Sequence, residues 1–238
     1  MAGFRRDRSS IDNVIALVSY VQHERSRKRL SAALFLDVKG AYDNVLHEAI
    51  LGALAVVGLG GRVFRWILSY LAARSFFVLT EDGPTTRRYT SRGVPQGGVL
   101  SPTLFNLALI GLAEYLPSTI KISIYADDIC VWTSAVTRPQ IRSRLQKAAT
   151  MIANYLLKQG LSISPEKCAL VAFTRKAMTP YVISICGRPI SYARTHRFLG
   201  IIIDRDLCWC PHVAYMKKRL TAISQLFKFL AGKTWGCQ

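Results

Sequence analysis

Two adjacent carboxylates, Asp127 and Asp128, stand between two apolar, strand-forming runs of this sequence. The runs at 121–124 and 129–132 predict a β-hairpin with both acids at its tip. Like charges held this close repel each other, and a divalent cation between them relieves the repulsion. The pair is therefore a candidate metal site. An ordinary solvated turn is the alternative, and the motifs described below weigh against it.

A third acid follows another apolar run. Residues 32–36 predict a buried strand that ends at Asp37, and neighbouring strands of one sheet would bring this side chain to Asp127 and Asp128. Carboxylate oxygens are ligands that Mg²⁺ prefers. In a two-metal scheme, one ion activates an attacking hydroxyl and the other, ~4 Å away, neutralises the leaving phosphates. The three acids thus predict nucleotidyl transfer with two Mg²⁺ ions, for which Mn²⁺ is a substitute.

The charge of the chain indicates an anionic polymer as partner. Among 238 residues, 32 Lys and Arg oppose 14 Asp and Glu, which gives a net charge of +18 spread along the sequence. A phosphate backbone fits this charge best. No apolar run reaches the roughly 20 residues of a membrane span, and no secretory signal is visible. These features predict an intracellular protein with no membrane partner.

Helical and strand patterns alternate along the rest of the chain, as in an α+β protein. Ser9 or Ser10 is predicted to cap a helix with Ile11, Ile15 and Val18 on one face. The other predicted elements are two helices in 44–72, a hairpin around 82–84, a glycine-rich loop at 92–102 leading into a helix capped by Ser101, a helix at 137–159, strands at 169–173, 181–185 and 198–203, and a helix at 213–230.

A group of zinc-ligand residue types lies near the C-terminal end. Cys208, Cys210 and His212 are close in sequence, and His196 would be a fourth ligand. Their spacing differs from that of the usual zinc motifs, and the segment resembles a strand end. The sequence therefore favours a structural role for these side chains over a zinc site.

Several motifs occur together in one order. Residues 35–43, 93–102 and 125–128 closely resemble the motifs of a reverse transcriptase, and 160–167 and 197–200 resemble the fourth and fifth palm motifs of the non-LTR, LINE-type retrotransposon branch. Five motifs in family order and with family spacing are far more specific than one tetrapeptide. The resemblance covers nearly the whole chain.

The resemblance implies a right-hand polymerase palm, with an antiparallel sheet backed by helices. Residues 1–33 would be partial fingers, 34–206 the palm with an inserted fingers segment at about 49–92, and 207–238 the start of the thumb. It also implies an RNA template, a DNA primer and deoxynucleoside triphosphates as partners, and action in the nucleus. It leaves the oligomeric state open.

The resemblance assigns roles to five side chains. Asp37 and Asp127 would bridge both metals, with Asp128 as a supporting acid. Tyr42 matches the steric gate that excludes a ribose 2′-hydroxyl, although a tyrosine here could also be part of the core. Lys167 matches a lysine proposed to protonate the leaving pyrophosphate, although an isolated lysine is more often a surface residue.

Five further residues complete the implied site. Gln96 and Gly97 match the loop that contacts the incoming nucleotide and its templating partner, with a plain helix-entry loop as the alternative. Phe198, Leu199 and Gly200 would form the primer grip, which holds the primer 3′ end in line for attack.

The chain departs from the family pattern in places. Ser164 and Cys168 stand where the family usually has asparagine and threonine, which loosens the role given to Lys167. The fingers strands would precede Gly3 and the thumb would continue after Leu230. We therefore expect a fragment of a retrotransposon reading frame, with weak or no polymerisation by this chain alone.

Two other functions compete with an RNA-directed DNA polymerase. The first is a catalytically inactive nucleic-acid-binding relic, held on RNA by charge. The second is an RNA-dependent RNA polymerase, which Asp43 favours and which Tyr42 and the loop at 95–98 disfavour. Group II intron maturases and telomerases share the palm, but the start of the chain at 3–12 resembles the retrotransposon branch.

Overall fold

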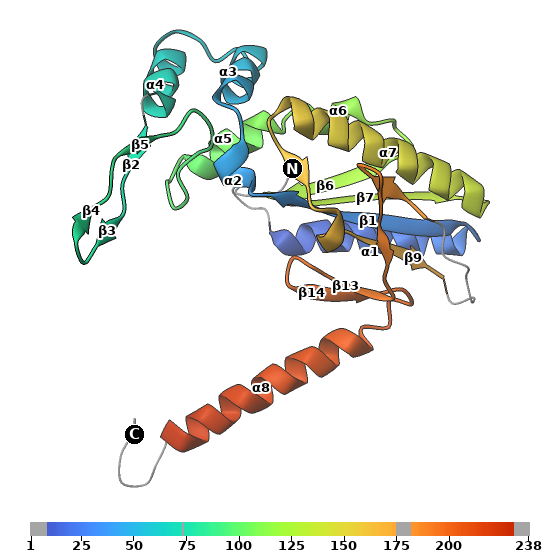
Figure 1. Cartoon of the computed structure of the whole chain (residues 1–238). Coiled ribbons are helices and arrows are strands. Elements are labelled where there is room, and N and C mark those ends of the chain that lie inside the picture. The colour runs from blue at the N-terminus through green and yellow to red at the C-terminus, as the bar shows by residue number, and fades with distance from the viewer. Residues whose placement is uncertain (1–8, 73, 175–181, 231–238) are drawn as a thin grey trace.

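A six-stranded sheet forms the centre of the molecule (Figure 1). The computed structural model describes residues 9–72, 74–174 and 182–230. Strand β1 lies in the middle and pairs antiparallel with β7 on one side and β9 on the other. The edge strands β6 and β12 pair with β7 and β9, the latter in parallel. The strands are β1 (Leu30–Lys39), β6 (Lys121–Tyr125), β7 (Asp128–Ala135), β8 (Ser162–Ile163, paired with the end of β1), β9 (Ala169–Phe173) and β12 (Ser191–Tyr192).

Both faces of this sheet are covered, which explains the uninterrupted apolar run in β1. Alternate residues of a strand point to opposite faces, so a strand buried on both faces needs apolar residues throughout. Leu34 and Leu36 pack in the core under α7 (Arg138–Lys158), whereas Ala33 and Phe35 pack in a second core with α1 (Ser10–Ser26). Figure 1 shows the two helices on opposite faces.

Helix α7 follows its sequence pattern closely. Thr137 is its N-cap and forms a capping box with Gln140, and the helix ends before Gly160, which has a positive φ of 76°. Its predicted inner face is confirmed as buried: Ile141, Leu145, Ala148, Ile152 and Leu156.

Helix α1 begins as predicted, with Ser9 as its N-cap, but its predicted inner face is wrong. Ile11 and Ile15 are 53% and 55% exposed, and the helix instead buries a face that includes Val14 and Leu17. Apolar residues occur on both sides of this helix, so periodicity alone leaves the inner side open. Contact with Phe35 in the second core selects the buried side.

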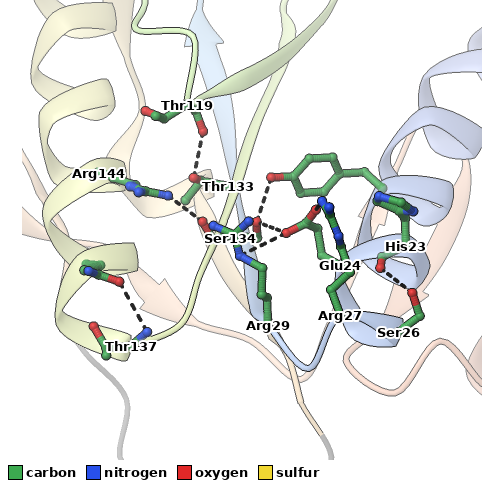
Figure 2. Close-up of polar contacts among 12 residues, drawn as sticks. His23, Glu24, Ser26, Arg27, Arg29, Thr119, Thr133, Ser134, Thr137 and Arg144 are labelled. Carbon is green, nitrogen blue, oxygen red and sulfur yellow. Dashed lines mark hydrogen bonds and ion pairs between the residues drawn. The ribbon is translucent and has the colours of Figure 1, made fainter.

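A buried carboxylate ties α1 to the sheet (Figure 2). Glu24 is 5% exposed, and its Oε2 atom accepts a hydrogen bond from the Ser134 hydroxyl and lies 3.3 Å from Arg29 Nε. The Tyr20 hydroxyl also donates to Ser134 Oγ, at 3.0 Å. Arg144 donates to the Ser134 backbone carbonyl at 2.6 Å, so α7 is joined to the same point of β7.

Between β1 and β6 the chain leaves the sheet. The two predicted helices and the predicted hairpin are confirmed, and the hairpin forms an arm that extends from the body (Figure 1). Ser101 is the first residue of α5 instead of its cap, and its hydroxyl donates to the Pro95 carbonyl. The elements are α2 (Ala41–Asn44), α3 (His47–Val56), α4 (Gly61–Leu71), the paired strands β2 (Ser75–Phe76) and β5 (Arg88–Tyr89), the paired strands β3 (Leu79–Thr80) and β4 (Gly83–Pro84), α5 (Ser101–Ala108) and α6 (Leu112–Tyr115).

The C-terminal third differs from its sequence prediction. In place of one strand at 198–203, β13 (Thr195–Phe198) and β14 (Ile201–Asp204) form a hairpin. Leu199 and Gly200, both with positive φ, make its turn. The other elements are the 3₁₀ turn η1 (Pro165–Lys167), β10 (Ser184–Ile185), its partner β11 (Arg188–Pro189), and α8 (Cys210–Leu230), which projects from the body (Figure 1).

Some predictions fall on residues outside the described ranges. These are the beginning of the motif at 3–12, the start of the strand predicted at 181–185, and the end of the predicted thumb segment at 231–238. Among the described helices, none combines the length and the apolar character that crossing a membrane requires.

Candidate active site

Two strands and a turn bring the three predicted acids together. Asp128 is the first residue of β7 and is the pairing partner of Asp37 on β1. Asp127 lies in the turn between β6 and β7, as the hairpin prediction required. Asp37 does not end its strand, because β1 continues to Lys39 and pairs there with β8.

The three carboxylates are distributed over two cavities. Asp37 and Asp127 line a cavity of about 620 Å³, and Asp37 and Asp128 line a smaller neighbouring cavity of about 130 Å³. Burial raises the pKa of Asp128 to about 6, and the negative charges of Asp127 and Asp37 add to this effect. A protonated Asp128 reduces the repulsion among the three acids.

The donor chemistry of these acids fits a divalent cation. Their oxygen atoms are hard ligands, and a cation would balance the charge that raises the pKa of Asp128. Within the described part of the chain, no three His, Cys, Asp or Glu side chains converge closely enough to hold a metal ion as they stand.

Lys167 lies beside the acids, at the end of η1. Its Nζ atom is 3.5 Å from Asp37 Oδ2, and its side chain is 66% exposed. The lysine lines both cavities, so it can reach a ligand in either. An exposed ion pair of this kind contributes little to stability, so it can be broken at low cost. The Lys167 ammonium group is therefore available to bind a phosphate.

The larger cavity also contains the predicted nucleotide-binding residues. Tyr42 on α2 lines it, as do Gln96 and Gly97 from the loop before α5. The Tyr42 ring stacks on Phe105, with 5.1 Å between ring centroids, and Phe105 is fully buried. Burial, followed by the nearby Asp127 charge, raises the pKa of Tyr42, so its hydroxyl stays protonated. Phe105 thus holds the Tyr42 ring in place. The two residues are 63 positions apart, so the local sequence pattern does not predict this contact.

Backbone contacts clamp the glycine-rich loop to α2. Val94 N donates to the Tyr42 carbonyl at 2.7 Å, and Gly93 N donates to the Val45 carbonyl at 2.7 Å. Gly93 has a φ of +81°, and a Cβ atom there would lie 2.6 Å from the Asp43 carbonyl oxygen. Only glycine permits this approach.

One side-chain contact completes the clamp. Gln96 Nε2 donates to Asp43 Oδ1 at 3.0 Å. From the sequence, Asp43 is expected only as a sign of RNA polymerase activity, and its contact with Gln96 is not predicted. One feature of the sequence indicates this contact: Asp43 directly follows Tyr42, in the segment that contacts the glycine-rich loop.

The predicted primer-grip residues lie in the β13–β14 hairpin. Phe198 is buried and lines the smaller cavity with Asp37 and Asp128. Of the described residues in this hairpin, Leu199 and Gly200 form the turn and line neither cavity. The structure therefore brings Phe198 to the acids, and places the other two at the hairpin tip.

The zinc-ligand residue types have other contacts. His212 Nδ1 accepts a hydrogen bond from Ile202 N at 3.3 Å, which joins α8 to β14. His196 packs on Phe35 with 4.5 Å between ring centroids, and burial lowers its pKa. Cys208 N donates to Asp204 Oδ1 at 3.1 Å, and Cys210 begins α8.

Solved structures share this fold. Apo telomerase from Candida tropicalis, truncated from its C-terminal domain, superposes with a TM-score of 0.58 and 13% identity, over 85% of this chain and 39% of that one. Telomerase from Candida albicans in complex with a telomeric RNA fragment gives a TM-score of 0.54 and 15% identity, over 85% of this chain and 34% of that one. The predicted palm fold is confirmed.

Curated relatives come from mobile elements. The "RNA-directed DNA polymerase from mobile element jockey" of Drosophila funebris is 28% identical over 241 residues, which are 97% of this chain and 26% of that protein. The "Retrovirus-related Pol polyprotein from type-1 retrotransposable element R2" of Popillia japonica is 28% identical over 212 residues, which are 81% of this chain and 34% of that protein. The chain thus spans about a quarter of the jockey relative and a third of the R2 relative.

A sequence model of one family, described as "Reverse transcriptase (RNA-dependent DNA polymerase)", matches residues 1–203. This match includes all five motifs, the three acids and the clamped loop. The chain belongs to the reverse transcriptase family, and polymerases of non-LTR retrotransposons are among its relatives.

Proposed function

We propose that this chain is the polymerase core of a retrotransposon protein and adds deoxynucleotides to a primer 3′-hydroxyl on an RNA template. One observation carries the proposal: a single cavity of about 620 Å³ is lined by Asp37, Asp127, Tyr42 and the clamped loop at Gln96. Family membership and the names of the relatives support the same chemistry.

Each residue has a separate task in this reaction. Asp37 and Asp127, assisted by Asp128, would hold two Mg²⁺ ions, which supply the Lewis acid for phosphoryl transfer when bound. The primer 3′-hydroxyl loses its proton to solvent and its oxygen attacks the α-phosphorus, while the bond between that phosphorus and the oxygen that bridges it to the β-phosphorus breaks. Lys167, on the rim of the cavity, gives a proton to the departing pyrophosphate.

Tyr42 selects the sugar. Its ring is held against Phe105 and faces the cavity, where it would occupy the space of a ribose 2′-hydroxyl. Gln96 and Gly97 support the pair formed by the incoming base and the template base. Phe198, beside Asp37 and Asp128, aligns the primer end.

Single-nucleotide incorporation tests the proposal. The assay uses a DNA primer on an RNA template with Mg²⁺ and compares the chain with Asp127→Asn and with Asp206→Asn, whose side chain is exposed outside both cavities. We expect slow incorporation, in line with the weak polymerisation expected of this chain alone, which Asp127→Asn abolishes and Asp206→Asn leaves unchanged. Equal incorporation by all three proteins would refute the role of the acids.

The sugar preference separates two polymerase classes. If Tyr42 is the gate, the chain prefers deoxynucleotides, and Tyr42→Ala admits ribonucleotides at a rate at least 10 times higher than the parent does. A parent protein that prefers ribonucleotides would instead be an RNA-dependent RNA polymerase.

A binding function without catalysis is the second candidate. The net charge of +18 favours it. Such a protein would bind RNA–DNA hybrid with an affinity that falls steeply with salt and does not depend on Mg²⁺. Binding of this kind together with no incorporation would select this candidate over the polymerase.

A further inference from the structure

A histidine from α3 anchors the beginning of the glycine-rich loop. His47 Nε2 lies 2.9 Å from the Gly93 carbonyl oxygen, across 46 residues of sequence. A carbonyl oxygen only accepts hydrogen bonds, so Nε2 carries the hydrogen and donates it. Gly93 is buried, and its amide donates to the Val45 carbonyl at 2.7 Å. Both polar groups of the Gly93 backbone are therefore bonded to the same short stretch of chain.

The position of His47 at a helix N-terminus does not account for this contact. His47 is the first residue of α3, and the N-cap of that helix, Leu46, forms no side-chain capping bond. A polar side chain at a helix N-terminus ordinarily accepts hydrogen bonds from the first free amides of its own helix. The His47 imidazole instead donates to a distant loop. Its contact therefore concerns the position of the loop.

The chain that carries His47 is itself fixed to the body of the molecule. Leu46 N donates to the Gln159 carbonyl at 3.0 Å, at the end of α7. Gly160 packs so closely against this chain that a Cβ atom there would lie 2.9 Å from the Asn44 carbonyl oxygen. Helix α7 in turn packs on the central sheet. His47 therefore joins the loop to a support that the loop does not itself provide.

The other end of the loop is fixed separately. The Ser101 hydroxyl donates to the Pro95 carbonyl, and Gly98 N donates to the same oxygen at 3.1 Å. These two bonds close the part of the loop that contains Gln96 into a turn at the start of α5. Because a turn closed in this way moves as one unit, its position beside the acids depends on how Gly93 is held at its beginning.

We propose that His47 is a positioning residue, which holds the glycine-rich loop where Gln96 meets the incoming nucleotide. The inference rests on the proposed polymerase function. Val94 N donates to the Tyr42 carbonyl, so the loop and the residue proposed as the sugar gate are held in one arrangement beside the larger cavity. Loss of the imidazole would take from the buried Gly93 carbonyl its bond to His47 and loosen that arrangement.

Hydrogen–deuterium exchange of the 238-residue chain measures the anchoring without any substrate. The Gly93 and Val94 amides donate to backbone carbonyls of the chain beside His47, so opening of the loop exposes both amides to exchange. We expect His47→Ala to speed their exchange about 5- to 10-fold, as the loss of one hydrogen bond would. His47→Gln has an amide nitrogen that can donate to the same carbonyl, and it should stay within about 2-fold of the parent. Peptides from α7 should exchange equally in all three proteins.

Nucleotide use shows whether the anchored loop matters to the reaction. Single-turnover incorporation on a DNA primer and an RNA template would be followed at increasing deoxynucleotide concentrations. We expect His47→Ala to raise the half-saturating concentration about 5- to 10-fold and to leave the maximal rate and primer–template binding within about 2-fold of the parent. His47→Gln should restore the parental value. His23→Ala, which removes an exposed histidine of α1, is the matched control and should behave as the parent does.

Failure of this role and failure of the proposed function give different results. A parent protein that incorporates no nucleotide refutes the proposed function, and the exchange rates still show whether His47 anchors the loop. The role of His47 is refuted if His47→Ala leaves the exchange of Gly93 and Val94 unchanged, if His47→Gln is impaired as strongly as His47→Ala, or if faster exchange leaves the half-saturating concentration unchanged. Equally faster exchange in α7 would also refute it, because His47 would then support the fold as a whole.

Discussion

Ionisation of Asp128 destabilises the folded protein. Its pKa is raised to about 6 by burial and by the charges of Asp127 and Asp37, compared with an ordinary value of 3.8. Between these two pH values, the unfolded chain is ionised at this position and the folded chain is protonated. Folding therefore loses stability as the pH rises through this window, and the loss is complete above about 6.

Asp128→Asn removes this cost. We expect the variant to be more stable than the parent by about 1–2 kcal/mol at pH 7.5, after allowance for solvent screening of this half-exposed group. The difference should shrink to near zero at pH 4. Urea unfolding at the two pH values measures it. A constant difference at both pH values would mean that the substitution acts through packing instead of charge.

Asp43 is a positioning residue for the nucleotide loop. Its carboxylate holds the Gln96 amide, and an asparagine could accept the same hydrogen bond whereas an alanine could not. We expect Asp43→Ala to weaken binding of the next deoxynucleotide to the enzyme with a terminated primer–template about 5-fold. Loss of one exposed hydrogen bond has an effect of about this size. Asp43→Asn should stay within 2-fold of the parent, a margin of about 0.4 kcal/mol.

Native-gel trapping of that complex measures the effect, with binding of the primer–template alone as the control. If both Asp43 variants lose the deoxynucleotide equally, the negative charge matters and the hydrogen bond does not. That result would contradict the positioning role.

At the scale of elements, the junction of α1 with β7 depends on Glu24. Its carboxylate is buried beside Ser134 and Arg29, and truncation to alanine leaves those polar groups without their partner (Figure 2). We expect Glu24→Ala to lower the free energy of unfolding by about 3 kcal/mol.

Arg27→Ala is the matched substitution. Arg27 lies 3.8 Å from the same carboxylate but its side chain is 60% exposed, so its loss should cost less than about 1 kcal/mol. Thermal and urea unfolding of both variants would show the contrast. Equal costs would mean that the buried network adds no more than a surface ion pair.

At the scale of the whole molecule, α8 stands apart from the body (Figure 1). None of its residues is buried, and Leu220 in its middle is 59% exposed. Leu220→Asn should therefore change the free energy of unfolding by less than about 0.5 kcal/mol. Leu145→Asn, in the buried face of α7, should cost more than about 3 kcal/mol.

Urea unfolding at several protein concentrations distinguishes the causes of a different outcome. A cost above about 1 kcal/mol for Leu220→Asn would mean that α8 is covered in solution. If that cost rises with concentration, a second copy of the chain covers the helix. A cost that is independent of concentration would mean that α8 folds back on its own body.

The features that depend on local patterns can be predicted from the amino-acid sequence alone. The strands around Asp127 and Asp128, the two-sided burial of β1 and the inner face of α7 follow from periodicity, and the structure confirms them. Five motifs in order were enough to indicate the family, because each is a short run of residues.

Other features depend on long-range packing, because the local pattern is compatible with more than one arrangement. The buried face of α1 depends on contact with Phe35 and its neighbours in the second core, and the hairpin at 195–204 depends on left-handed turn residues that a strand pattern conceals. The contact of Gln96 with Asp43 spans 53 residues. The distribution of the acids over two cavities likewise follows from strand register, which arises when distant segments pack together and no local pattern encodes it.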